Sequence, residues 1–221
     1  MRSLILLGLF LVSASAAVAD EPRIVRENIE WLDVWVPGNN AKGTPKVLLV
    51  GDSITRGYYG AVETGLKGKA VVCRLATSKS LGDPGLIAEV KLVLGQAAFD
   101  VIHVNNGMHG WDYTEAEYAK ALPELVATLR QAAPKAKLVF ATTTPVRTAT
   151  GELVAAKTDR VRARNKAVAD LAAAEKIPVN DLFAVVIDKP DLFSKDGVHL
   201  NAKGSDALGK QVADTVAGLL K

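Results

Sequence analysis

Five short apolar runs alternate with segments of helical pattern between residues 46 and 220. The runs consist mostly of valine, leucine and isoleucine, and most of them end at glycine or small polar residues. This pattern is typical of strands that are buried on both faces of a parallel sheet. The predicted strands lie within KVLLVGD (46–52), AVVCRLA (70–76), DVIHVNN (100–106), KLVFATTT (137–144) and IPVNDLF (177–183).

Apolar positions at helical spacing predict helices between and after these strands. Thr114 and Glu117 in TEAE match a capping box, in which the threonine caps the helix and the glutamate reaches back to it. Asp83 and Pro84 mark another helix start, because proline is favoured in the first helical turn. The predicted helices cover 58–67, 84–97, 114–132, 154–175 and 202–220.

The alternation of strand and helix predicts an α/β fold, in which a five-stranded parallel sheet carries helices on both faces. In such sheets, ligands bind at the carboxyl ends of the strands. Candidate functional residues should therefore follow the apolar runs. These positions are 51–53, 80–83, 105–107 and 142–144.

The first 19 residues have the pattern of a cleavable signal peptide. Arg2 gives a positive start, residues 4–12 are apolar, and small residues at 17–19 precede Asp20. The apolar stretch is much shorter than the roughly 20 residues that span a bilayer. This favours cleavage over the alternative of a retained membrane anchor. We expect a secreted or periplasmic protein with no stable membrane insertion.

Residues 20–45 form an N-terminal extension before the predicted domain of residues 46–221. The extension ends in VPGNNAKGTP, whose proline, glycine and asparagine content indicates a loop. Trp31 and Trp35 favour a short amphipathic element that packs on the core. A platform on which sugars stack is the alternative for these two side chains.

Composition and charge exclude some partners. The chain of 221 residues is long enough for one domain with a sizeable core, and its formal net charge of +3 is too balanced for nucleic acid to be the main partner. The single cysteine, Cys73, lies inside an apolar run. We expect it to be a small buried hydrophobic residue, and the fold to have no internal disulfide.

Ser53 in GDSITRG follows the first predicted strand and is a candidate nucleophile. A serine hydroxyl needs a base to take its proton, and that base is usually histidine. Of the three histidines, His199 lies in SKDGVHLNAKG, with Asp196 three residues earlier. A carboxylate so close can hydrogen-bond the imidazole and fix its tautomer. The alternative for this segment is an ordinary surface loop.

The other two histidines have different settings. His103 lies inside the third predicted strand, which favours a core histidine with a hydrogen-bond partner. His109 follows that strand at the sheet edge, where it either contacts substrate or orders its loop. The pair does not match a metal-binding motif, so we expect no metal and no other cofactor.

Acyl transfer also needs hydrogen-bond donors for the oxyanion. The N–H groups of Ser53 and Gly82 follow the first two predicted strands, and Asn105 or Asn106 offers a side-chain amide after the third. GDSITRG is neither a phosphate-binding loop nor the G-x-S-x-G elbow of the α/β-hydrolases, because it lacks the spacing of both.

GDSIT, SLGD and DGVHLN, in this order, resemble the SGNH, or GDSL, hydrolase family over about residues 46–220. The resemblance implies a flavodoxin-like three-layer α/β/α sandwich and no metal. It implies Ser53 as nucleophile, His199 as base and Asp196 as the acid that orients it. The oxyanion hole would consist of the Ser53 and Gly82 N–H groups and an asparagine.

The third block departs from the family pattern G-x-N-D, because this chain has VNNGMHGWD there. Asn106 is preferred as the oxyanion donor and Asn105 is the rival, since a shift of one residue turns a strand side chain to the other face. His109 and Trp111, together with Asn105, are expected to shape the substrate pocket.

These expectations favour a secreted serine esterase that removes a short acyl group, with an acetylated carbohydrate as the favoured substrate. The partner is a small-molecule or polysaccharide ester, and the oligomeric state is left open. One alternative is a lysophospholipase or lipase, which the aromatic content of 5% weakens. The other is a non-catalytic carbohydrate-binding protein that keeps the same fold.

Overall fold

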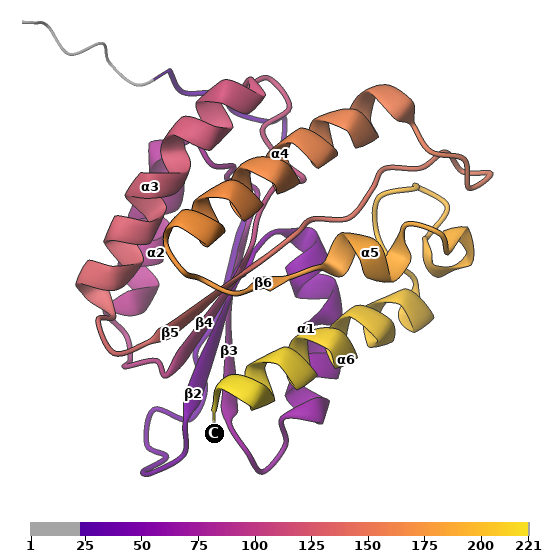
Figure 1. Ribbon diagram of the computed structural model, residues 1–221. Coiled ribbons are helices and arrows are strands. Elements are labelled where there is room, and N and C mark those ends of the chain that lie inside the picture. Colours follow the sequence, from indigo (N-terminus) through magenta and orange to yellow (C-terminus); the bar gives the residue numbers. More distant parts are fainter. Residues whose placement is uncertain (1–22, 221) are drawn as a thin grey trace, which may run out of the picture.

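The computed structural model describes residues 23–220, which form a sheet between two layers of helices (Figure 1). The predicted α/β sandwich is confirmed with one correction, because the sheet has six strands rather than five. The predicted signal peptide, residues 1–19, lies outside the described residues.

Five parallel strands correspond to the five apolar runs of the sequence: β2 (Lys46–Gly51), β3 (Val71–Thr77), β4 (Val101–Asn105), β5 (Lys137–Ala141) and β6 (Val179–Asn180). They lie side by side in the order β3-β2-β4-β5-β6. The register pairs Gly51 of β2 with Asn105 of β4, so the polar residues after these two strands meet at one edge of the sheet.

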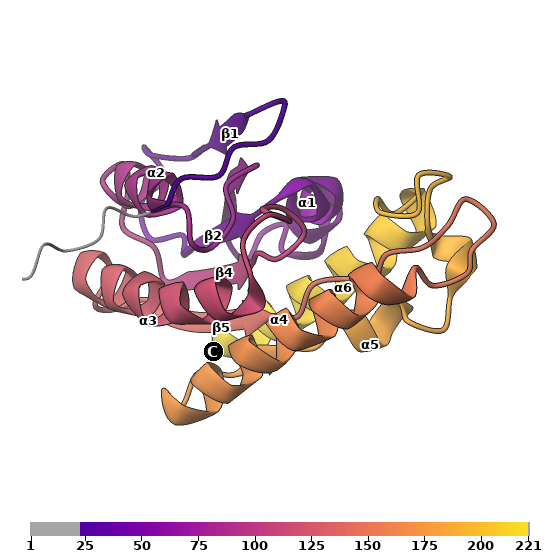
Figure 2. The same ribbon diagram turned by 90° about the horizontal axis from the view of Figure 1, so that it is seen from above.

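The sixth strand, β1 (Leu32–Trp35), pairs antiparallel with β3 at an edge of the sheet (Figure 2). Trp35 is 54% exposed, so this tryptophan does not pack on the core as the sequence predicted. The physical reason is that β1 is an edge strand with little buried surface. Such a strand does not need a regular alternation of apolar and polar positions, so the sequence pattern did not predict a strand here.

One face of the sheet is covered by α2 (Pro84–Leu94), α3 (Glu115–Ala132) and α4 (Ala155–Ala174). These helices pack on strand side chains such as Leu48 and Ile102. The capping box predicted at the start of α3 is confirmed, since the Thr114 hydroxyl accepts the Glu117 N–H and the Glu117 carboxylate accepts the Thr114 N–H.

The opposite face is covered by α1 (Ser53–Gly65), α5 (Leu182–Val186) and α6 (Ala202–Leu219). Figure 1 shows α1 and α6 on the other side of the strands from α2 and α3. A short 3-10 helix, η1 (Pro190–Leu192), follows α5. No helix within residues 23–220 combines the length and the hydropathy that a membrane-spanning helix needs.

α1 begins earlier than the sequence predicted. The start is at Ser53 because Asp52 caps the helix, with its Oδ1 accepting the Ile54 N–H at 2.9 Å. Of the stretch GDSIT, Gly51 ends β2, Asp52 is the cap, and the helix begins with Ser53. Aspartate is one of the residues that are strongly preferred at a helix cap. This arrangement sets Ser53 directly at the carboxyl end of β2.

Candidate active site

Ser53, His199 and Asp196 form one chain of hydrogen bonds. Nε2 of His199 lies 2.9 Å from Oγ of Ser53, and Nδ1 of the same ring lies 2.7 Å from Oδ2 of Asp196. The structure thus brings together a serine and a histidine that are 146 positions apart in the chain. Such an arrangement lets the imidazole take the hydroxyl proton while the carboxylate stabilises the imidazolium.

The junction of β2 and α1 places Ser53. Its N–H lies in the first helical turn, where backbone N–H groups have no partner within the helix. Asp52, beside it, is fully buried and accepts the N–H groups of Ile54 and, at 3.2 Å, of Met108. Burial raises the pKa of the Asp52 carboxyl, and the nearby His109 together with these N–H groups opposes the rise.

A tight turn before α6 holds Asp196 and His199 together. Oδ1 of Asp196 accepts the N–H groups of Val198 and His199, each at 2.9 Å, which leaves Oδ2 for the ring. Gly197 has a φ of +70°, a conformation that favours glycine. Partial burial would raise the pKa of Asp196, but the hydrogen bonds from the ring and from the two N–H groups hold it below its usual value.

The turn after β3 carries Gly82, whose φ is +99°. A side chain there would be strained and would press on the ring of Tyr113. Among residues 23–220, the N–H groups of Ser53 and Gly82 donate to no other group. Both backbone donors are therefore available to a ligand.

The two asparagines at the carboxyl end of β4 point in different directions. Nδ2 of Asn106 donates to the Lys79 carbonyl at 2.9 Å, and its Oδ1 accepts the Leu81 N–H at 3.2 Å. Asn105 is fully buried, and its Nδ2 donates to the Tyr58 hydroxyl at 3.3 Å. Of the two, Asn106 is the one that reaches the turn of Gly82.

The loop after β4, residues 107–113, carries His109 and Trp111. Nδ1 of His109 lies 2.8 Å from Oε2 of Glu27, and both ring-bearing side chains line the space above Ser53. His103 lies away from this space. It is fully buried in β4 and shares a hydrogen bond of 3.3 Å with Asn180, as expected for a core histidine.

Two spaces of unequal size border Ser53 and His199. An open cleft of about 570 Å³ lies on one side, with Trp31 and Trp111 in its walls. The guanidinium of Arg56 stacks on the Trp31 ring, 4.7 Å from its centroid. On the other side, between α1 and α6, the space is only about 30 Å³. The two sides of the serine can therefore take groups of very different size.

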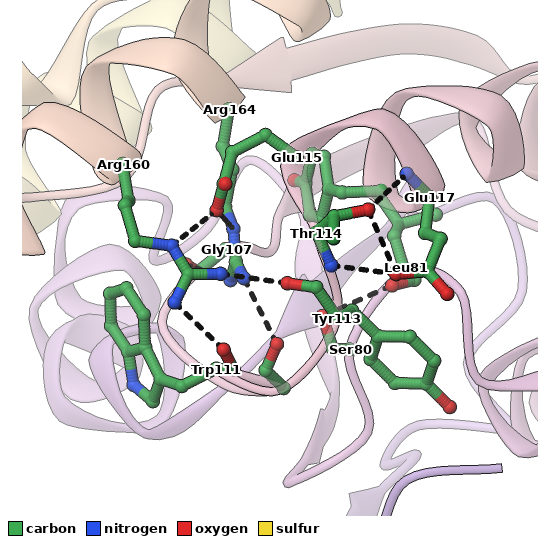
Figure 3. A network of polar contacts seen from close by, with 12 residues as sticks. Ser80, Leu81, Gly107, Trp111, Tyr113, Thr114, Glu115, Glu117, Arg160 and Arg164 are labelled. Atoms are coloured by element: carbon green, nitrogen blue, oxygen red, sulfur yellow. Dashed lines mark hydrogen bonds and ion pairs between the residues drawn. The ribbon is translucent and has the colours of Figure 1, made fainter.

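Sequence patterns did not point to the residues that hold the loop 107–113. Arg164 of α4 is fully buried and donates to three carbonyl groups within residues 107–110, at 2.7 to 3.0 Å. Arg160 donates to the carbonyls of Trp111 and Tyr113, at 2.7 Å each (Figure 3). No signal in TDRVRARNK distinguishes the buried arginine from its exposed neighbours. Glu27 likewise lies in a segment without a motif.

The chain matches the model of a known family. The model of the GDSL-like lipase/acylhydrolase family matches residues 49–207 of the chain. No curated protein is similar enough in sequence to count as a relative.

Solved structures of low sequence identity share the fold. A carbohydrate acetylesterase from Sinorhizobium meliloti is 20% identical with a TM-score of 0.64, and the match covers 80% of this chain and 100% of that chain. An aryl esterase from M. smegmatis is 16% identical with a TM-score of 0.67, over 80% and 100% of the two chains. A carbohydrate esterase family 3 protein from Talaromyces cellulolyticus is 17% identical with a TM-score of 0.64, over 80% and 98%.

Proposed function

Since the family match spans most of the chain, this protein belongs to the GDSL-like lipase/acylhydrolase family and hydrolyses carboxylic esters, and we propose that Ser53 is its nucleophile. The observation that carries the proposal is the chain of hydrogen bonds from Ser53 through His199 to Asp196. His199 acts as the base, and Asp196 orients its ring. The lowered pKa of Asp196 keeps this carboxyl ionised when the imidazolium forms.

Acylation begins when Oγ of Ser53 attacks the carbonyl carbon and its proton passes to Nε2 of His199. The carbonyl oxygen becomes an oxyanion, to which the N–H groups of Ser53 and Gly82 donate. Each donor of this kind contributes about 3 kcal/mol to the stability of the transition state. Collapse of the intermediate expels the alcohol, which takes the proton from His199 and leaves the acyl group on Ser53.

Deacylation uses the same residues. Water attacks the acyl-enzyme while His199 takes one of its protons, and a second oxyanion forms at the same donors. When this intermediate collapses, Ser53 recovers its proton from His199 and the carboxylic acid leaves. The cycle ends with the side chains in the arrangement that the structure has.

A short acyl group suits the narrow space beside Ser53. That space, lined by Leu200 and Leu208 among others, measures about 30 Å³. A cavity of roughly 10–15 Å³ in this measure holds one water molecule, so this space admits a group as small as the methyl of an acetyl ester. A long acyl chain would have to displace α6. We therefore propose an acetyl ester as the substrate.

The alcohol part of the substrate takes the open cleft. Trp31 and Trp111 in its walls combine an apolar ring with a polar N–H, which suits a sugar. Two of the similar structures are described as a carbohydrate acetylesterase and a carbohydrate esterase, and a third is described as an aryl esterase. These observations support an acetylated carbohydrate. The predicted signal peptide supports action after export from the cytoplasm.

The test is a panel of nitrophenyl esters from acetate to octanoate, together with acetylated polysaccharides, given to the wild type and to Ser53→Ala. We expect turnover to be fastest with acetate, to fall with chain length, and to be absent in a folded Ser53→Ala protein. Unchanged turnover in that variant would contradict the role of Ser53. A preference for octanoate would contradict the acetyl assignment, and glycan binding without any hydrolysis would favour the non-catalytic alternative.

A further inference from the structure

The ring of His109 has one nitrogen with a partner and one without. Nδ1 is held 2.8 Å from Oε2 of Glu27. Nε2 is buried, and residues 23–220 provide it with no hydrogen-bond partner. Leaving a buried polar atom unpaired costs free energy, so each case in a native structure calls for an explanation, of which a catalytic role is one.

The ring lies next to the proposed nucleophile. His109 lines the same cleft as Ser53 and His199. It also lies close to Asp52, because the N–H of the preceding residue, Met108, donates to Oδ2 of that carboxylate at 3.2 Å. Burial raises the pKa of the Asp52 carboxyl, and His109 opposes this rise more than any other group. Asp52 directly precedes Ser53, so the imidazole lies beside the first turn of α1, where the Ser53 N–H is found.

The two asparagines that the sequence offered as oxyanion donors are already engaged. The amide of Asn106 is bonded at both ends to the backbone of the turn 79–82. It fixes the shape of the turn that presents Gly82. The amide of Asn105 points to Tyr58, below the first turns of α1.

The loop that carries His109 is fixed from behind by α4. Arg164, which is fully buried, bonds the carbonyl groups of Gly107, His109 and Gly110. Figure 3 shows Arg164 and Arg160 side by side, both directed at this loop. The carbonyl groups therefore face α4, whereas the N–H groups of Met108 and Gly110 face the carboxylates of Asp52 and Glu27.

The N-terminal segment fixes the ring from the front. Glu27 accepts the Gly110 N–H at 3.0 Å through Oε1 and holds the ring through Oε2. Two further contacts hold this segment. The Val25 N–H donates to the Tyr113 hydroxyl at 2.9 Å. Arg23 forms an ion pair with Glu117 at 3.0 Å. The imidazole is thus held between Glu27 and the neighbourhood of Asp52.

We propose that Nε2 of His109 donates the third hydrogen bond to the oxyanion, in place of the asparagine that the family resemblance implied. Glu27 acts as a positioning residue, because it holds Nδ1 and with it the orientation of the ring. When both nitrogens donate, the ring is an imidazolium, and its charge adds to the stabilisation of the oxyanion. This inference rests on the proposed function, since it requires an oxyanion on an ester bound to Ser53.

The test compares His109→Phe with His109→Gln on nitrophenyl acetate. Phenylalanine keeps the volume of the ring beside Trp31 but has no donor, and we expect kcat to fall by roughly 100-fold with little change in KM. Glutamine keeps an N–H donor, and we expect kcat to stay within about tenfold of the wild type. If His109→Phe does not fold, His109→Ala takes its place, and thermal unfolding checks every variant.

A matched pair of carboxylate variants separates positioning from a general loosening of the segment. Glu27→Gln removes the charge that holds the ring, and Glu117→Gln weakens the tether of the same segment at Arg23 without touching His109. We expect only Glu27→Gln to lower kcat. Equal effects of the two variants would overturn the role of Glu27.

Three results would overturn the role of His109. They are a kcat within threefold of the wild type in folded His109→Phe, a loss that appears only in KM, and a His109→Gln protein as slow as His109→Phe. Ser53→Ala in the same series distinguishes the two proposals. If Ser53→Ala is inactive and His109→Phe is not impaired, only the further inference fails. If Ser53→Ala is fully active, the proposed function fails.

Discussion

Two loops bring histidines to the cleft over Ser53, and they are held in contrasting ways. The turn of His199 is held by a neighbour in sequence, since Asp196 bonds two N–H groups and the ring. The loop of His109 is held by Arg164, 55 positions later, and by Glu27, 82 positions earlier. The His199 side chain is 48% exposed, whereas that of His109 is 16% exposed.

The two loops differ in whether their shape depends on neighbouring residues or on distant parts of the fold. A local turn closes whenever its few residues are present, so it adds little to the stability of the fold and can be changed at little cost in stability. A loop held by buried, distant partners forms only when the whole fold forms. Variants of the turn should therefore lose chemistry alone, and variants of the supports of the loop should lose stability as well.

The largest expected effect is that of His199→Ala. Loss of the proposed base should lower kcat by roughly a million-fold. The free energy of unfolding should change by no more than about 0.5 kcal/mol, because the side chain is half exposed. Asp196→Asn should lower kcat less, by about 10⁴-fold. Steady-state kinetics measures kcat, and urea unfolding measures the free energy of unfolding. A large loss of stability in His199→Ala would remove the contrast between the two loops.

The next largest effect is expected at Arg164. Arg164→Met keeps the length of the side chain but leaves the carbonyl groups of Gly107 and His109 without a donor, whereas the Gly110 carbonyl still accepts the Tyr113 N–H. The variant should lower the free energy of unfolding by about 3 kcal/mol. Arg160→Met is the matched control, because that side chain is 33% exposed and water can replace its bonds. Urea unfolding should place Arg160→Met closer to the wild type. If the two variants are equally stable, the burial of Arg164 is not what holds the loop 107–113.

The smallest of these effects concerns His103, which belongs to neither loop. Burial lowers the pKa of His103 to about 4. Because the unfolded chain then binds more protons between about pH 6.5 and 4, stability should rise with pH across this window and fall as the pH drops through it. The loss between pH 7 and pH 5 should be about 2 kcal/mol. His103→Gln should flatten this dependence in urea unfolding at a series of pH values, and an unchanged slope would contradict the assignment.

The central sheet could be predicted because its strands are buried on both faces and read as continuous apolar runs. β1 could not, since most of its side chains face solvent. The start of α1 carried a signal, the aspartate cap at Asp52, but the polar residues after it resemble a turn. α5 has only five residues, too few for a helical period to show.

The residues of the site also fall into two groups, those that a sequence motif indicates and those that only the fold brings together. Ser53, Asp196 and His199 stand in short motifs, so their candidate roles could be read from the sequence, and the structure brings their side chains within hydrogen-bond distance. The partners of His109 could not be read. Glu27 and Arg164 reach it only through the fold, and the choice between Asn105 and Asn106 depended on which way each amide turns.

The most direct test of the central claim is covalent labelling with a fluorophosphonate, which reacts with an activated serine. We predict one adduct per chain, located at Ser53 by peptide mass spectrometry, with loss of turnover in proportion to labelling and no adduct in Ser53→Ala. Full turnover in protein that is labelled at Ser53, or an inactivating adduct at another residue, would contradict the account.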